Sequence, residues 1–144
     1  DKSVHTTDNL DGMIKLVDII SSNYEGFVWI NLNDYDSKYG HRRDKLGYLH
    51  ALEEFDHYLP VIIHHLKEDD LLIICADHGN DPTHVGTDHT REKVPFLAYS
   101  KSMEGNGLLP EENTFAVIGA TVVDNFGLSM PEGTIGTSVL DKLS

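Results

Sequence analysis

DLLIICADHG, residues 70–79, says most about the fold, because an apolar run passes directly into Asp, His and Gly. A continuous apolar run of about four to eight residues is typical of a strand that is buried on both faces. FVWINL, residues 27–32, and VPFLAYS, residues 94–100, are two further runs of this kind. We therefore expect three buried strands, at 27–32, 70–76 and 94–100.

Helical periodicity flanks these strands. Apolar residues spaced three or four apart predict an amphipathic helix over about 9–22 and a long helix over about 46–67, with a kink at Pro60. Thr114 is a candidate cap for a third helix, which Gly127 would end. Strands that alternate with helices favour an α/β fold with a mostly parallel sheet.

Composition limits the classes of function. The chain has 24 Asp and Glu against 11 Lys and Arg, a formal net charge of −13. Nucleic acid is therefore not an expected partner, since its phosphates need a basic surface. No apolar run reaches the roughly 18 to 20 residues of a membrane helix, so we expect no membrane partner either. The single cysteine, Cys75, excludes an internal disulfide, and a cytoplasmic location is the simplest interpretation.

The chain shows no internal repeat, low-complexity tract or obvious linker. Residues 1–144 are therefore expected to form one domain segment. The first residue is Asp1 rather than Met, and we expect the chain to continue a longer polypeptide whose remainder is its partner.

Two loops that follow predicted strands are rich in Asp and His. NDYDSKYGHRRD, residues 33–44, follows the first strand, and DHGNDPTHVGTDHTRE, residues 77–92, follows the second. Open α/β sheets bind ligands at the carboxyl ends of their strands. Asp77 and His78 can reach one ion only if the chain turns between them, and Gly79 supplies that freedom. A solvated surface turn is the alternative for this pair.

Asp36, His41 and His89 extend the set of candidate metal ligands. Asp36 and His41 are five residues apart on the first loop, and His89 follows His78 by eleven residues on the second. Mixed oxygen and nitrogen donors suit Mn²⁺ or Zn²⁺, whereas oxygen-only sets suit Mg²⁺ or Ca²⁺. Two divalent ions about 3.5 to 4 Å apart can bind both ends of a phosphoryl displacement. A two-metal phosphoryl-transfer site is therefore our hypothesis.

The same segments resemble the carboxyl-terminal part of the phosphopentomutases, which belong to the alkaline phosphatase superfamily. The resemblance rests on FVWINLNDYDSKYGHRRD, ALEEFDHYLP, DDLLIICADHGNDPTHVGTDHTREKVPFLAYS and IGATVVDNFG. ADHGND followed by GTDHTRE at this spacing is its most specific part. The resemblance implies an alkaline-phosphatase-like sandwich, incomplete in this chain. It also implies an isomerase of nucleoside catabolism, which interconverts ribose or deoxyribose 1-phosphate and 5-phosphate through a phosphothreonine enzyme.

The resemblance also implies a role for each candidate ligand. Asp36, His41 and His89 match the ligands of one metal, and Asp77 and His78 match part of the ligand set of a second metal. Two Mn²⁺ ions are expected, with Zn²⁺ or Mg²⁺ as substitutes, and a sugar phosphate as the substrate. The family's further Asp ligand, Thr nucleophile and cap domain are not represented, so no catalytic residue can be assigned in this chain.

Two other functions stay open. The parent protein could be another enzyme of the superfamily, such as a phosphoglycerate mutase or a phosphatase. The chain as isolated could be a noncatalytic metal-binding domain, and we expect it to be inactive alone. Thr83, Thr87 and Thr90 are not expected to be nucleophiles, because the resemblance places the nucleophile elsewhere.

Three arginines flank the candidate ligands and could hold carboxylates or meet phosphate through paired hydrogen bonds. We favour a supporting role for Arg91. For Arg42 and Arg43, a supporting role and a salt bridge within an acidic loop are equally favoured interpretations.

Overall fold

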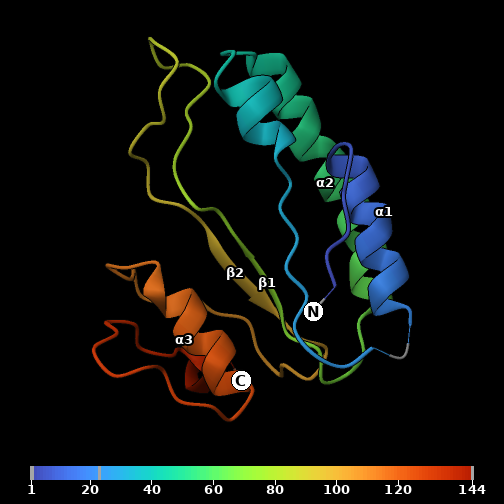
Figure 1. Ribbon diagram of the computed structural model, residues 1–144, viewed down its shortest axis with the longest axis vertical. Helices are drawn as coiled ribbons and strands as arrows, with labels where there is room; N and C mark the ends of the chain where they lie inside the picture. Colours follow the sequence, from blue (N-terminus) through green and yellow to red (C-terminus); the bar gives the residue numbers. More distant parts are fainter. Residues whose placement is uncertain (1, 23, 144) are drawn as a thin grey trace. The chain divides into compact units, whose positions relative to one another are not determined.

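The computed structural model describes residues 2–22 and 24–143. Its elements, in chain order, are α1 (Asn9–Ile20), the π-helix η1 (Tyr35–Gly40), α2 (Lys45–His65), β1 (Leu72–Cys75), β2 (Phe96–Tyr99), α3 (Ala116–Asn125) and the 3₁₀-helix η2 (Leu140–Lys142) (Figure 1). They fall into a first unit, Asp1–Lys67 with His78–Pro95, and a second unit, Glu68–Asp77 with Phe96–Ser144. None of the helices in the described part of the chain is long and apolar enough to span a membrane.

The first unit is built on the two helices that the periodicity predicts, and α1 and α2 lie in contact. Asp8 caps α1, because its carboxylate accepts a hydrogen bond from the Asp11 amide at 2.8 Å. Asp44 caps α2 in the same way through the Gly47 amide at 2.9 Å. Helix α2 continues through Pro60. Both predicted helices are confirmed, with ends that differ by one or two residues.

The segment at 27–32 is not a strand, which corrects the prediction made from its apolar run. Its side chains nevertheless alternate. Ile30 and Leu32 lie against α1, where a Cβ added to Gly12 would be 3.2 Å from each of them, whereas Trp29 is 67% exposed. A strand is stabilised by hydrogen bonds to a neighbour, and in the described residues the one sheet contains only β1 and β2.

The two remaining strand predictions are confirmed, and with them the mixed α/β class. The direction of pairing needs correction, because β1 and β2 run antiparallel, with Leu72 opposite Tyr99 and Cys75 opposite Phe96. A parallel pair needs a crossover connection, usually a helix. Residues 76–95, which connect these strands, contain no helix. The mostly parallel sheet is therefore not found among the residues that the structure describes.

The second unit has its own small core. Thr121 of α3 is 0% exposed. Its hydroxyl donates to the Val117 carbonyl at 2.8 Å and accepts from the Val139 amide at 3.1 Å, which ties α3 to the segment before η2. The predicted end of α3 at Gly127 is found, whereas the residue in the N-cap position is Phe115 rather than the predicted Thr114. The Thr114 hydroxyl accepts from the Ala116 amide, and Gly127 adopts a left-handed φ of 65° just after the helix.

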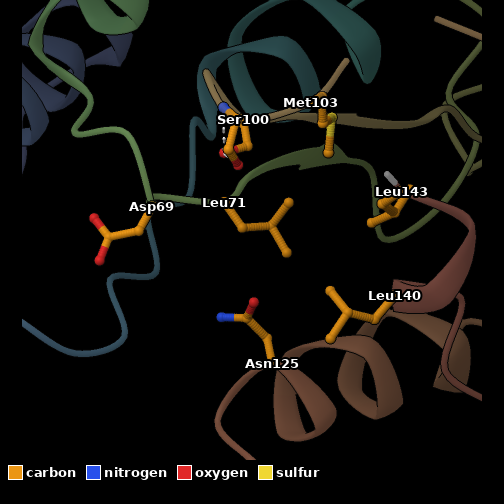
Figure 2. Close-up of a pocket in the computed structure, with 8 residues that line it drawn as sticks. Asp69, Leu71, Ser100, Met103, Asn125, Leu140 and Leu143 are labelled. Carbon is orange, nitrogen blue, oxygen red and sulfur yellow. Dashed lines mark hydrogen bonds between the residues drawn. The ribbon is translucent and has the colours of Figure 1, made fainter. Parts of the chain in front are cut away.

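A cavity of about 320 Å³ lies within the second unit, and Figure 2 shows its lining. Polar and apolar side chains share this lining, among them Leu71, Ser100, Asn125 and Leu140. None of the five candidate metal ligands lines it, and four of the five belong to the first unit.

Candidate metal centre

Asp36 and His41 are brought to one side of the chain by the π-helix η1. The His41 amide bonds the Asp36 carbonyl at 3.0 Å, which is the five-residue hydrogen bond of a π-turn. In an α-helix, residues five apart point about 140° away from each other. The wider π-turn removes most of that divergence. The Asp36–His41 spacing therefore suits a shared ligand site only because this segment is not α-helical.

Several contacts fix η1 in the first unit. Asp34, its first flanking residue, bonds reciprocally with Asn9 of α1, each backbone amide donating to the other side chain at 3.0 Å. Lys38 donates to the same Asp34 carboxylate at 2.9 Å, which raises the pKa of the Lys38 ammonium. Burial, with nearby negative charge, raises the pKa of Tyr35 to about 12. The Tyr35 phenol therefore stays protonated and donates to the Ala51 carbonyl of α2 at 3.0 Å.

His78 and His89 are brought together by a short antiparallel bridge. Gly79 pairs with Thr90, whose amide donates to the Gly79 carbonyl at 3.1 Å. The residues that precede Gly79 and Thr90 then lie diagonally on one face of the bridge. His78 and His89 occupy these two positions, and their rings stack with centroids 3.6 Å apart. The Thr90 hydroxyl is engaged in holding the bridge, since it accepts from the Asp81 amide at 2.6 Å.

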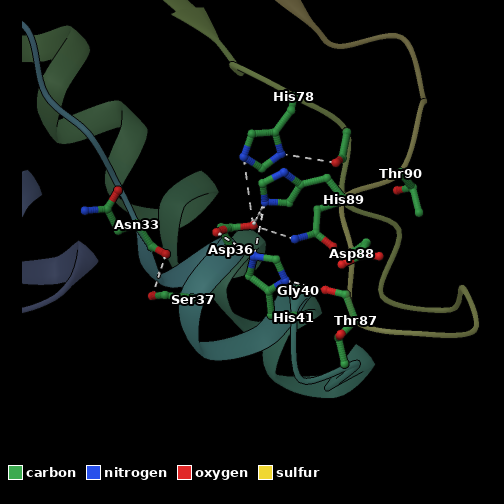
Figure 3. Close-up of polar contacts among 12 residues, drawn as sticks. Asn33, Asp36, Ser37, Gly40, His41, His78, Thr87, Asp88, His89 and Thr90 are labelled. Atoms are coloured by element: carbon green, nitrogen blue, oxygen red, sulfur yellow. Dashed lines mark hydrogen bonds and ion pairs between the residues drawn. The ribbon is translucent and has the colours of Figure 1, made fainter.

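Four of the five predicted ligands converge on one point, as Figure 3 shows. The Asp36 carboxylate lies 3.3 Å from His41 Nε2, 3.3 Å from His89 Nε2 and 3.9 Å from His78 Nε2. The Nε2 atoms of His41 and His89 are 3.1 Å apart. The four side chains are between 29% and 45% exposed, so the cluster is open to solvent.

Backbone carbonyls fix which nitrogen of two rings faces the carboxylate. His41 Nδ1 bonds the Thr87 carbonyl, and His78 Nδ1 bonds the Gly79 carbonyl at 3.1 Å. A carbonyl only accepts, so Nδ1 carries the proton and Nε2 of the neutral ring presents a lone pair. In both rings Nε2 is therefore the nitrogen that faces the Asp36 carboxylate. Metal-ligating histidines are oriented in this way in proteins, with the other ring nitrogen bonded to a carbonyl or carboxylate.

The distances agree with a single ion held by Asp36, His41 and His89. Two ligand atoms that each lie about 2.1 Å from a metal, at tetrahedral to octahedral angles, are separated by about 3.0 to 3.4 Å. His41 Nε2 and His89 Nε2 are 3.1 Å apart, and Asp36 meets them through different oxygens, Oδ2 toward His41 and Oδ1 toward His89, each at 3.3 Å. Asp36, His78 and His89 form a second, wider trio, whose ligand atoms lie within 4.8 Å of one another. Both trios contain Asp36 and His89, which are therefore common to either arrangement of ligands.

Asp77, the fifth predicted ligand, belongs to the second unit, whereas the four clustered residues belong to the first. Its place in a metal site stays a prediction.

Arg43, rather than the favoured Arg91, makes the contacts that support the cluster. Arg91 is exposed, whereas the Arg43 guanidinium bonds the carbonyls of Asp81 and Asp88, the latter next to His89.

Asn80 is a residue that sequence reasoning missed. Its side-chain amide donates to Asp36 Oδ1 at 2.6 Å. An Asn directly after Gly79 is typical of an ordinary turn. The only signal in the sequence was therefore its position, two residues after His78 in a loop crowded with candidate ligands.

Comparisons with known proteins point to one family. The model of the metalloenzyme superfamily matches residues 2–130. Among curated proteins, the phosphopentomutase of Agathobacter rectalis is 56% identical over 135 residues, and that of Clostridium perfringens strain SM101 is 59% identical over 135 residues. The phosphopentomutase of Clostridium tetani is 56% identical. Each alignment covers 94% of this chain and 34% of the relative, so the chain spans about a third of the length of the curated relatives it matches.

Proposed function

The chain belongs to the metalloenzyme superfamily, and we propose that it forms the metal-binding part of a phosphopentomutase. The proposed reaction moves a phosphoryl group between O5 and O1 of ribose or deoxyribose, with a phosphothreonine outside these residues as the carrier. The relatives named phosphopentomutase support this assignment through their identity of 56 to 59% over 94% of the chain. They favour it over a phosphoglycerate mutase or a general phosphatase of the same superfamily.

The observation that carries the proposal is the convergence of Asp36, His41, His78 and His89. Their ligand atoms come from two loops more than 30 residues apart in sequence, and they face one another at 3.1 to 3.9 Å. Three imidazoles gathered around one carboxylate form a mixed nitrogen and oxygen set of the kind that divalent transition metals take in proteins. We infer that the cluster holds divalent metal.

The ligand partition is part of the proposal. We assign Asp36, His41 and His89 to one ion, as the resemblance to the phosphopentomutases implies, and their 3.1 to 3.3 Å contacts support this grouping. We assign His78 and Asp77 to a second ion, whose remaining ligands lie outside this chain. His78 suits this role because its Nε2 is 3.9 Å from Asp36 Oδ1, farther than the other two imidazoles. Mn²⁺ is the ion that the mixed oxygen and nitrogen donors favour, with Zn²⁺ or Mg²⁺ as substitutes.

The chain's own residues supply binding and orientation. Bound divalent ions would offset the charge of the transferred phosphoryl group and of the attacking oxygen. The Thr87 and Gly79 carbonyls hold the imidazoles of His41 and His78 with Nε2 toward the site. The π-turn and the bridge hold the ligands on facing segments before substrate arrives. Such preorganisation avoids reordering the site during the reaction.

A cytoplasmic location completes the proposal. It is supported by the single free cysteine, Cys75. Burial and the charge of Asp77 raise the pKa of its thiol, so Cys75 stays in the weakly reactive thiol form.

We expect residues 1–144 alone to show no mutase activity, and the whole polypeptide that contains them to be active. The isolated chain supplies metal ligands but no matched nucleophile and no cap for the sugar phosphate, and positioning of the reactants provides much of the rate in such reactions. The test is conversion of ribose 5-phosphate with Mn²⁺, followed by ³¹P NMR.

A blank of Mn²⁺ without protein serves as the control for this assay. Conversion by residues 1–144 above that blank would mean that a nucleophile lies within this chain. A whole polypeptide that hydrolyses or isomerises 3-phosphoglycerate or p-nitrophenyl phosphate, and leaves ribose 5-phosphate unchanged, would instead favour another enzyme of the superfamily.

A further inference from the structure

Arg43 stands out in the first unit because its backbone adopts φ 54°. It is the only non-glycine residue with positive φ among the residues that the structure describes. Residues other than Gly, Asn and Asp seldom adopt this left-handed conformation, because Cβ crowds the backbone. Such an outlier persists only where the surrounding contacts hold it. The contacts of its side chain therefore need an explanation.

The Arg43 guanidinium is enclosed by oxygen acceptors from the loop that carries His89. Nη1 donates to the Asp81 carbonyl at 2.8 Å, Nη2 to the Asp88 carbonyl at 2.6 Å, and Nε to the Gly86 carbonyl at 2.5 Å. Nη1 also bonds the Gly40 carbonyl of η1 at 3.2 Å. One side chain thus fastens the loop at 81–88 to the helix that carries Asp36. A lysine has a single ammonium and cannot reproduce this planar fork of donors.

Asn80 connects Arg43 to the metal cluster. Arg43 Nη1 donates to Asn80 Oδ1 at 2.9 Å. A guanidinium can only donate, so this contact fixes the amide oxygen on the Arg43 side and the amide NH₂ on the other. The NH₂ group then donates to Asp36 Oδ1 at 2.6 Å. The same oxygen is 3.3 Å from His89 Nε2, so Asn80 sets the rotation of the carboxylate toward its imidazole neighbours.

Gly40 leaves room for this contact. A Cβ added at Gly40 would lie 2.3 Å from Asn80 Nδ2 and 2.6 Å from Asn80 Cγ. Any larger residue at position 40 would displace the Asn80 amide from Asp36. The close approach of Asn80 to η1 is therefore built into the backbone, independently of Arg43.

We propose that Arg43 and Asn80 are positioning residues, which act together through Asp36 to set the affinity of the metal centre. Arg43 holds the loop that carries His89 against η1, and Asn80 transfers that alignment to the Asp36 carboxylate. Neither residue is a metal ligand in this assignment. The proposal rests on the proposed metal centre, since it gives a role to the residues around it.

The test measures Mn²⁺ binding to the whole protein by isothermal titration calorimetry. Asn80→Ala and Arg43→Lys should each lower the affinity for one of the two Mn²⁺ ions by about 10- to 100-fold, as loss of a hydrogen bond to a metal ligand does in other proteins. The Arg43→Lys/Asn80→Ala double variant should lose less than the product of the two single effects, because both act through Asp36. Arg42→Lys is the matched control, since Arg42 is an exposed neighbour, and its Mn²⁺ affinity should not change.

A second readout separates positioning from simple loss of structure. The electron paramagnetic resonance spectrum of bound Mn²⁺ should change in Asn80→Ala, while thermal unfolding of the metal-free variant stays close to wild type. Mn²⁺ affinities in both single variants equal to that of Arg42→Lys would overturn the positioning role and leave the metal centre standing. A wild-type protein that binds no Mn²⁺ would overturn both.

Discussion

Asp36→Asn should abolish tight Mn²⁺ binding at the first ion and reduce mutase activity of the whole protein by about a thousandfold or more. Asp36 is the carboxylate that all three clustered imidazoles share, at 3.3, 3.3 and 3.9 Å. The amide that replaces it carries no charge and can offer only one oxygen. The expected loss exceeds the roughly 10- to 100-fold that follows removal of a supporting hydrogen bond, because a direct ligand is removed.

The measurements for Asp36→Asn are Mn²⁺ titration by calorimetry and conversion of ribose 5-phosphate at saturating Mn²⁺. Asp56→Asn is the matched control, because Asp56 is an exposed carboxylate on α2 of the same unit. Asp56→Asn should bind Mn²⁺ with wild-type affinity and convert ribose 5-phosphate at the wild-type rate. An Asp36→Asn variant with the affinity of this control would show that the carboxylate does not coordinate metal.

The second large effect is a fall in the number of bound Mn²⁺ ions, which distinguishes the ligands of one ion from those of the other. His41→Ala and His89→Ala should each reduce Mn²⁺ binding from two ions to one, because His41 and His89 contribute to the same sphere as Asp36. Asp77→Asn should lower the affinity for the other Mn²⁺ ion. A site that loses one of about three protein ligands cannot complete its coordination at low Mn²⁺ concentration.

His57→Ala is the matched control for the histidine variants, since His57 is exposed on α2. Equal effects of His41→Ala and Asp77→Asn on both ions would contradict the partition into two spheres. Unchanged stoichiometry in all three variants would contradict the ligand assignment itself. The affinity should also fall as the pH is lowered, because protonated imidazole has no lone pair for metal.

Much of the candidate site could be predicted from the sequence because the candidate ligands lie on two loops that each follow an apolar run. The run at 70–76 ends at Asp77, and its strand β1 is found at Leu72–Cys75. The loop beyond it carries His78 and His89, and the loop after 27–32 carries Asp36 and His41. Their convergence required only that the two loops meet. The helices were also predictable, since apolar residues three or four apart mark their buried faces.

The remaining features depend on contacts that a local pattern does not record. The π-turn at Tyr35–Gly40 has no periodic signature, yet it aligns Asp36 with His41. Arg91 is close to His89 in sequence and was favoured for support, but Arg43 fills that role through a left-handed backbone. The strand predicted at 27–32 is absent because an apolar run does not specify a hydrogen-bonding neighbour.

Anomalous diffraction at the manganese edge, from crystals of the whole protein grown with Mn²⁺, tests the metal centre most directly. We predict one peak about 2.0 to 2.3 Å from an Asp36 oxygen and from Nε2 of His41 and His89. A second peak should lie about 3.5 to 4 Å away, beside His78 and Asp77. Manganese bound only by other residues, or no peak within coordination distance of Asp36, would contradict the account.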